Sequence, residues 1–291
     1  MDGKIKMNYK NPDSLVDTAW LEDHLNAPDV RIVDATMFLP NVDRNAAKEF
    51  AECHIPGAVY FDINDIADSD TDLPHMLPEV EKFSSKVRKL GLGDGCRIVV
   101  YDSNGGYLAA CRVWWMFRVF GHKDIAVLDG GLPKWLAENR PVTDEVTVLK
   151  ERHFSARKNT TLVRSVKQIK NLLNAPKEQI VDARALDRFL GTAPEPREGM
   201  KSGHIPGSIS LPFTQFMDMQ NHAVFKSADE IKSAIDQAGI DVKKPIVTSC
   251  GSGVTACVLA MGMFLLGHEN VAIYDGSWSE WGMRDDTPVE T

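Results

Sequence analysis

The stretch Ile246-Val247-Thr248-Ser249-Cys250-Gly251-Ser252-Gly253-Val254-Thr255-Ala256 contains a short β-branched run, then a cysteine with glycines close by, then the start of an apolar segment that continues to Leu266. The β-branched run is typical of a buried strand, and the apolar segment predicts a helix. A strand that passes through a short loop into a helix is the unit of parallel sheets, whose sites lie at the carboxyl ends of the strands. We therefore expect the chemistry of this chain at Cys250.

Several short segments of the chain occur twice in the same order. Ile-Val-Asp-Ala at 32–35 recurs at 180–183, and His-Ile-Pro-Gly at 54–57 recurs at 204–207. Gly-His at 121 and 267, Asp-Gly at 129 and 275, and Pro-Val at 141 and 288 continue the series. A near-constant spacing of 146 to 150 residues indicates a duplicated domain and is far longer than a solenoid repeat. We predict one domain at 15–145, a second at 160–291, and a charged linker with one extended stretch within 143–164.

Both halves alternate short β-branched runs with helical patterns. In the first half we predict strands at 31–33, 58–61, 97–101 and 125–128, and helices at 46–52, 79–90, 107–120 and 132–138. In the second half we predict strands at 180–181, 208–211, 246–249 and 271–274. This alternation is typical of the α/β class. Each half should be a parallel sheet with helices on both faces.

The composition is that of an ordinary globular protein. The 291 residues are 43% hydrophobic and 25% charged, which excludes disordered, collagen-like and coiled-coil chains. Lys and Arg number 33 against 41 Asp and Glu, and the net charge of −8 argues against binding nucleic acid. The longest apolar stretch, 256–266, is shorter than the roughly 20 residues that cross a bilayer, so we expect no membrane partner.

The cysteine count and the N-terminal segment bear on location. Five cysteines, an odd and small number, do not form the disulfide framework of a small secreted protein. Residues 1–14 are polar and lack the apolar run of a secretory signal. We therefore expect a reducing compartment and place the protein in the cytoplasm.

The loop after Cys250 has the composition of an anion cradle. Gly251 and Gly253 permit backbone conformations that other residues avoid, so that successive N–H groups through Val254 and Thr255 can turn inward around the cysteine sulfur. The helix that follows adds its positive end. Such a setting lowers a thiol pKa and favours a thiolate nucleophile. The alternative is a small buried apolar cysteine, the commoner fate of a free thiol, and the flanking glycines favour the functional interpretation.

The first half provides an internal comparison. Its corresponding strand, 97–101, is followed by Asp102, which stands 148 residues before Cys250. A carboxylate cannot serve as a thiol nucleophile. We expect the first half to be catalytically silent and to contribute side chains to a site between the two halves.

Taken together, the His-Ile-Pro-Gly segments, the Asp-Gly turns and the final Cys-Gly-Ser-Gly-Val-Thr loop resemble the tandem-domain rhodanese superfamily, and within it the members that use 3-mercaptopyruvate. The resemblance covers about 15–289. It implies that Cys250 takes the sulfur of 3-mercaptopyruvate as a persulfide, releases pyruvate, and passes the sulfur to cyanide or to a thiol acceptor such as thioredoxin. It implies no metal and no organic cofactor.

The resemblance also assigns roles to residues outside the loop. Arg188 and Arg197 match the family's substrate-binding arginines, and their guanidinium groups have the forked geometry that a carboxylate needs. Ser252 and His75 match the serine and histidine of a proposed serine–histidine–aspartate relay that protonates the pyruvate enolate. The acidic member of that relay is missing here, because its position is Asn64. Asn64 itself, or the neighbouring Asp62 or Asp65, is left to support His75.

Several other residues invite a second interpretation. His54 and His204 have no Cys or carboxylate partners at ligand spacing, so we interpret them as structural and predict no metal site. Cys257 follows Cys250 by seven residues, too far along a helix for a disulfide, and is expected in the core. The pair Trp114-Trp115 lies in an apolar helical pattern and indicates packing.

Three alternative functions remain. The nearest is the same fold acting on thiosulfate, which Gly251 and Ser252 disfavour because they offer no cation to a dianion. A cysteine phosphatase needs an arginine six residues after its cysteine, where this chain has Ala256. A non-catalytic binding module would not need Cys250.

Overall fold

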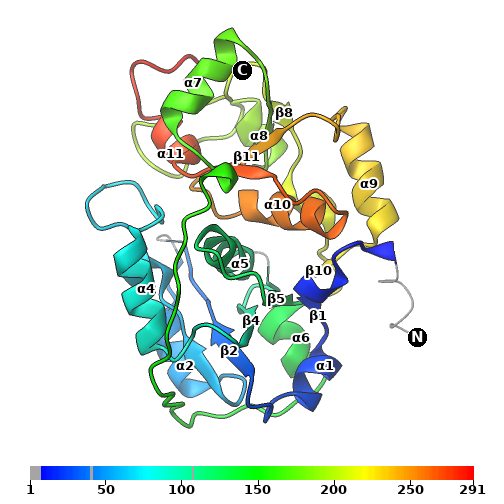
Figure 1. The fold of residues 1–291 in the computed structure, drawn as a ribbon. Coiled ribbons are helices and arrows are strands. Elements are labelled where there is room, and N and C mark those ends of the chain that lie inside the picture. Colours follow the sequence, from blue (N-terminus) through cyan, green and yellow to red (C-terminus); the bar gives the residue numbers. More distant parts are fainter. Residues whose placement is uncertain (1–7, 40–41, 107) are drawn as a thin grey trace.

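The computed structural model describes residues 8–39, 42–106 and 108–291, and each half contains a parallel five-stranded sheet (Figure 1). In the first half the strand order is β1-β5-β4-β2-β3, with β1 (Leu15–Val16), β2 (Val30–Asp34), β3 (Ala58–Tyr60), β4 (Arg97–Tyr101) and β5 (Ile125–Leu128). In the second half it is β6-β12-β11-β7-β8, with β6 (Val163–Arg164), β7 (Gln179–Asp182), β8 (Ile209–Ser210), β11 (Ile246–Ser249) and β12 (Ala272–Tyr274). The two orders correspond strand for strand. The predicted α/β class is confirmed.

Helices cover both faces of the first sheet. Successive residues of a strand point to opposite faces, so Val33 joins one apolar cluster and Ile32 another. The cluster of Val33 includes side chains of α4 (Val80–Lys89) and α5 (Ala110–Val119). The cluster of Ile32 includes side chains of α1 (Thr18–Asp23) and α6 (Gly131–Ala137).

The second sheet is covered in the same way. Val181 of β7 packs with α9 (Ala228–Gln237) and α10 (Ala256–Leu265), whereas Ile180 packs with α7 (Val166–Asn174) and α11 (Ser277–Trp281). The remaining elements are α2 (Ala46–Glu52), α3 (Ile63–Ile66), α8 (Leu186–Phe189), an antiparallel pair of β9 (Met217–Asp218) with β10 (Val224–Phe225), and 3₁₀ turns at Pro12–Ser14, Thr160–Leu162 and Phe213–Phe216.

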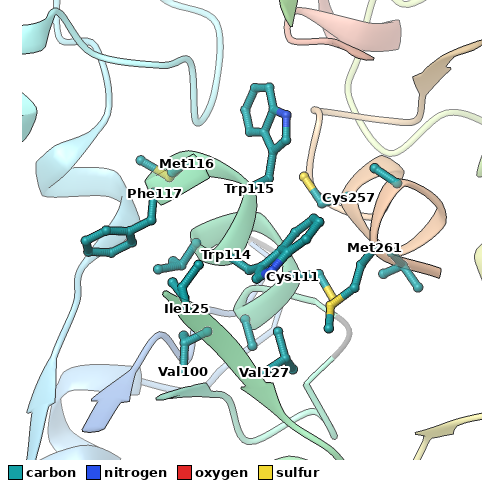
Figure 2. Close-up of a cluster of buried hydrophobic side chains, with 14 of the residues drawn as sticks. Val100, Cys111, Trp114, Trp115, Met116, Phe117, Ile125, Val127, Cys257 and Met261 are labelled. Atoms are coloured by element: carbon teal, nitrogen blue, oxygen red, sulfur yellow. The ribbon is translucent and has the colours of Figure 1, made fainter. Parts of the chain in front are cut away.

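The two halves share one core, which is centred on α5 and α10 (Figure 1). Figure 2 shows Trp114 and Trp115 of α5 beside Cys257 and Met261 of α10, and all four side chains are fully buried. Cys111 of α5 approaches Met261 with a sulfur-to-sulfur distance of 3.7 Å. The expectations that Cys257 and the tryptophan pair are packing residues are therefore confirmed. No helix within the described residues is long and apolar enough to cross a bilayer.

The segment predicted as a linker, 143–164, forms backbone hydrogen bonds with the first half along much of its length. Thr143 pairs with His54 in an antiparallel bridge, His153 O accepts from the N–H of Asp94, and Arg157 N–H donates to Phe120 O. The expected extended stretch is β6, at the end of this segment. The segment lacks regular structure over 144–159 because its backbone groups bond to loops of the first half and not to one another.

Candidate active site

Cys250 lies at the carboxyl end of β11, where the strand pattern placed it, and is 1% exposed. The loop 251–255 leads from it directly into α10. Within the described residues, none of the backbone N–H groups of 251–256 has a hydrogen-bond acceptor. Six N–H donors without an acceptor among these residues and the positive end of a ten-residue helix therefore follow the cysteine, and this arrangement favours an anion.

The carbonyl side of the same loop is held by α11. The N–H of Trp278 donates to Cys250 O over 2.9 Å, and the N–H of Ser279 donates to Gly251 O over 2.8 Å. Ser279 Oγ donates to the same Gly251 oxygen over 2.6 Å, and Ser277 Oγ accepts from the N–H of Cys250 over 3.2 Å. These contacts from α11 therefore fix the backbone of Cys250 and Gly251 at the start of the loop.

The two glycines of the loop differ in the conformations they adopt. Gly253 has φ +71°, and a Cβ there would stand 2.7 Å from Asp275 O, so this position requires glycine. Gly251 is outside the left-handed region, and a Cβ there would meet only the guanidinium of Arg188, at 3.6 Å and 3.7 Å. The expectation that both glycines supply special backbone conformations is therefore wrong for Gly251.

The corresponding loop of the first half is occupied by its own side chain. Asp102 is fully buried, and its carboxylate accepts four backbone N–H groups over 2.8 to 2.9 Å, those of Asn104, Gly106, Ala109 and Ala110. The predicted helix at 107–120 begins only at Ala110, because this loop winds around the carboxylate first; Tyr107 lies outside the described residues. In the first half the Asp102 carboxylate therefore binds the N–H groups of the loop. In the second half the described loop N–H groups have no such acceptor.

Arg188 and Arg197 both lie against the Cys250 loop. The guanidinium of Arg188 is beside Gly251 and pairs with Glu195, a buried carboxylate that also accepts from Arg184 Nη1 over 2.9 Å. Arg197 Nη1 donates over 2.6 Å to the Ser279 hydroxyl that binds the loop. Burial, and then the charge of Arg188, lower the pKa of Arg197. The two predicted arginines are therefore close enough to affect one another, and both are tied to the loop.

His75 reaches the site from the first half. Its Nδ1 lies 3.0 Å from Asn64 Oδ1. Burial lowers the pKa of His75 to about 4, with further contributions from the charges of Arg112 and Arg197. The effect of Arg197 on this pKa indicates that the His75 imidazole and the Arg197 guanidinium are near one another. Within the described residues Ser252 is half-buried and has no hydrogen bond to His75, so the expected serine–histidine contact is not formed.

The open question of which residue supports His75 is answered by these contacts. Asp62 caps α3 by accepting from the backbone N–H groups of Asn64 and Asp65. Asp65 pairs with Lys86 at 2.6 Å on the surface. Asn64 alone of the three candidates contacts the imidazole among the described residues.

Two groups at the site were not found from the sequence. Arg112 of α5 donates to the carbonyls of His75 and Gly253, and Asp275 accepts the backbone N–H of Leu77 over 2.8 Å. Arg112 is followed by five apolar residues in the middle of α5, and a cation in such a pattern is a signal that could have identified it. Asp275 belongs to the repeated Asp-Gly pair, which was interpreted only as a turn.

His54 and His204 have the same structural role in the two halves. His54 Nδ1 lies 2.7 Å from Phe50 O and Nε2 lies 3.1 Å from Glu145 O. His204 Nδ1 lies 2.8 Å from Phe189 O. The imidazole of His54 therefore fixes two backbone carbonyls, and that of His204 fixes one. The described residues contain no group of three or more His, Cys, Asp or Glu side chains that could hold a metal ion.

Comparison with known proteins agrees with this geometry. A model of the rhodanese-like domain matches the chain twice, over 17–138 and 165–284. The 3-mercaptopyruvate sulfurtransferase of Mus musculus is 43% identical over 93% of this chain and 92% of that protein. The thiosulfate sulfurtransferase of Rattus norvegicus is 40% identical over 96% of this chain and 94% of that protein.

A solved structure gives the same result. The crystal structure of the 3-mercaptopyruvate sulfotransferase SseA from Escherichia coli, described as a rhodanese fold, superposes with a TM-score of 0.83 at 37% identity. The match covers 91% of this chain and 98% of that one. Two matched domains, relatives of about 40% identity over nearly the whole length and a shared fold all lead to one assignment: the chain belongs to the rhodanese-like family and contains two rhodanese-like domains.

Proposed function

We propose that this protein is a 3-mercaptopyruvate sulfurtransferase. The observation that carries the proposal is the position of Arg188 and Arg197 against the loop that follows Cys250, whose backbone N–H groups have no acceptor within the described residues. Guanidinium groups bind carboxylates as forked donors, so the pair suits the carboxylate of a 2-oxo acid. The relatives named for 3-mercaptopyruvate, at 40 to 43% identity, support the same substrate.

The reaction transfers one sulfur atom and leaves pyruvate. The Cys250 thiolate attacks the thiol sulfur of 3-mercaptopyruvate, and an S–S bond forms as the C–S bond breaks. The electron pair of the broken bond remains on carbon as the pyruvate enolate, which takes up a proton to give pyruvate. The persulfide on Cys250 carries its negative charge into the N–H groups of 251–256.

His75 is proposed to move the proton in this reaction. Its Nδ1 donates to Asn64, so the neutral imidazole keeps Nε2 free to accept a proton. Nε2 takes the proton of the substrate thiol and returns it to the enolate carbon, so that the step needs no other acid. A pKa of about 4 keeps the imidazole neutral before substrate binds.

Thiosulfate is the second candidate substrate, since the rat relative is named for it. Thiosulfate is a dianion without a carboxylate, and the described loop offers it no cation at Gly251 or Ser252. Arg188 is already paired with Glu195. The single negative carboxylate of 3-mercaptopyruvate therefore fits the arginines better.

The test compares initial rates with 3-mercaptopyruvate and with thiosulfate, using cyanide and a thiol as acceptors. Wild type is compared with Cys250→Ser and with the matched control Cys53→Ser, a half-exposed cysteine next to α2. We expect a strong preference for 3-mercaptopyruvate, a lack of turnover in Cys250→Ser and normal rates in Cys53→Ser. Faster turnover of thiosulfate would reverse the substrate assignment, and activity in Cys250→Ser would exclude the persulfide.

The acceptor and the location are part of the same proposal. A thiol acceptor, either a small molecule or a thioredoxin-like protein, regenerates Cys250 by attack on the outer sulfur of the persulfide. All five cysteines are free, which fits the reducing cytoplasm. Release of sulfide on adding reduced thioredoxin to the sulfur-loaded enzyme tests the acceptor, and fractionation of cells tests the location.

A further inference from the structure

Arg112 of α5 is a buried cation that joins the two halves at the Cys250 loop. Nη1 donates to Gly253 O over 3.1 Å, and Nη2 donates to His75 O over 2.5 Å. Nη2 also lies 2.7 Å from Asp275 Oδ1, and the guanidinium carbon stands 4.5 Å from the centre of the Trp115 ring. The side chain is fully buried. One rigid planar group therefore holds a peptide of the first half and a turn of the second half at the same time.

The interface between the two halves has an active side, at Asp275 and the Cys250 loop, and a silent side, at Asp129. The silent side forms the corresponding contact without an arginine. On each side, the aspartate that follows the last sheet strand of one half accepts a backbone N–H of the other half. Asp275 accepts from Leu77 over 2.8 Å, and Asp129 accepts from Phe225 over 2.9 Å. The two donors are 148 residues apart and the two aspartates 146. The positions of His75 and of its counterpart Ala223 both have positive φ, at 61° and 54°. The two sides of the interface are therefore built alike.

Only the active side has the arginine. The helices α5 and α10 both begin with Ala-Cys, so the counterpart of Arg112 is Val258. Moving a guanidinium out of water is costly, and replacing a buried ion pair by apolar side chains is often neutral or stabilising. The contact between Phe225 and Asp129 forms although Val258 stands where the active side has Arg112. The two halves can therefore pack together without a buried cation at this position.

We propose that Arg112 is a positioning residue for the sulfur-transfer reaction, because it fixes the spacing between the His75 peptide and the Gly253 turn across the two halves. This inference rests on the proposed function. Proton transfer to and from a bound substrate depends on positions within about 1 Å, and a misplacement of that size can cost roughly 100-fold in rate. The arginine acts through His75 and does not touch the substrate.

The test uses Arg112→Lys, which can keep the pair with Asp275 but cannot span both carbonyls. We expect kcat for 3-mercaptopyruvate to fall at least tenfold, with KM changed less than threefold because Arg188 and Arg197 are intact. In a His75→Gln background the same substitution should change kcat less than twofold, since both act on one proton transfer. The matched control is Asp129→Asn on the silent side, which should alter stability without lowering kcat per folded molecule.

If urea unfolding shows that Arg112→Lys is not fully folded at the assay temperature, Arg112→Gln with Asp275→Asn replaces it, because that pair leaves no buried charge unmatched. Wild-type kcat in the folded variant would overturn the inference, as would an undiminished tenfold loss in the His75→Gln background. Failure of the proposed function is distinguishable, because then wild type itself would not turn over 3-mercaptopyruvate. That result would overturn both proposals.

Discussion

The imidazole of His75 donates from Nδ1 to Oδ1 of Asn64 over 3.0 Å. An amide oxygen fixes the tautomer and the orientation of the ring but carries no charge to stabilise the imidazolium. Burial and the cations Arg112 and Arg197 oppose that protonated form, and the pKa of His75 is lowered to about 4. The ring of the substrate-free protein is therefore held as a neutral hydrogen-bond acceptor at Nε2.

Replacing Asn64 by aspartate should reverse part of this effect. A carboxylate 3.0 Å from Nδ1 favours the protonated imidazole, so the pKa of His75 should rise by roughly 1 to 2 units. An NMR titration of the histidine ring signals measures it, with Asp65→Asn as the control on the same helix. An unchanged pKa would mean that the Asn64 contact is not kept in solution.

The pKa of His75 also predicts how stability depends on pH. The folded-state pKa of about 4 is below the unfolded value of 6.5, so protonation favours the unfolded chain. The stability that the neutral His75 side chain contributes to the folded state is fully present above pH 6.5 and is lost as the pH falls towards 4. Between pH 7 and pH 5 the loss from this one group should be about 2 kcal/mol. Urea unfolding at both pH values should show wild type losing that much more than His75→Asn, and equal losses would contradict the assignment.

The sequence predicted the interior strands most closely. Of the edge strands it predicted β3 and β8, it missed β1, and it gave β6 only as an extended stretch of the linker. The interior strands β4, β5 and β11 agree with prediction residue for residue, because each is a continuous apolar or β-branched run. The edge strands β1 and β6 contain two residues each, too few for any periodicity. A pattern of alternating hydrophobicity needs at least four residues to be recognised.

The same distinction holds for the site. Cys250 and the glycines around it are adjacent in the chain, so one short stretch revealed the loop. Ser279 and Arg112 act on the loop from α11 and α5, and only the folding of distant segments brings them there. His75 and the two arginines were identified by resemblance to a family, because no spacing in the sequence relates them to Cys250.

The glycines of the loop should differ sharply in their tolerance of alanine. Gly253→Ala places a Cβ 2.7 Å from a backbone oxygen at φ +71° and should lower the free energy of unfolding by at least about 2 kcal/mol. Gly251→Ala meets only the movable end of Arg188, at 3.6 Å, and should stay within about 0.5 kcal/mol of wild type. Urea unfolding of the two variants side by side measures both, and similar losses would show that the loop has a different conformation.

Asp102 should be essential to the stability of the silent loop and irrelevant to the substrate. Its carboxylate accepts four N–H groups, whereas the amide of Asp102→Asn turns donors towards some of them. We expect the free energy of unfolding to fall by about 2 to 4 kcal/mol. KM for 3-mercaptopyruvate should not change in the folded variant. A stability equal to wild type would show that an amide satisfies the four N–H groups of this loop as well as the carboxylate does.

Arg188 and Arg197 should govern substrate binding more than the chemical step. Arg188→Ala and Arg197→Ala each remove a forked donor for the substrate carboxylate, so KM for 3-mercaptopyruvate should rise roughly 10- to 100-fold while kcat changes about threefold or less. Arg97→Ala is the control, because Arg97 begins β4 at the opposite end of the sheet from the loops and pairs with Asp124 at 2.9 Å. Steady-state kinetics measures all three variants. An unchanged KM in both site variants would show that other groups hold the carboxylate, and a fall in kcat alone would give the arginines a role in the transition state.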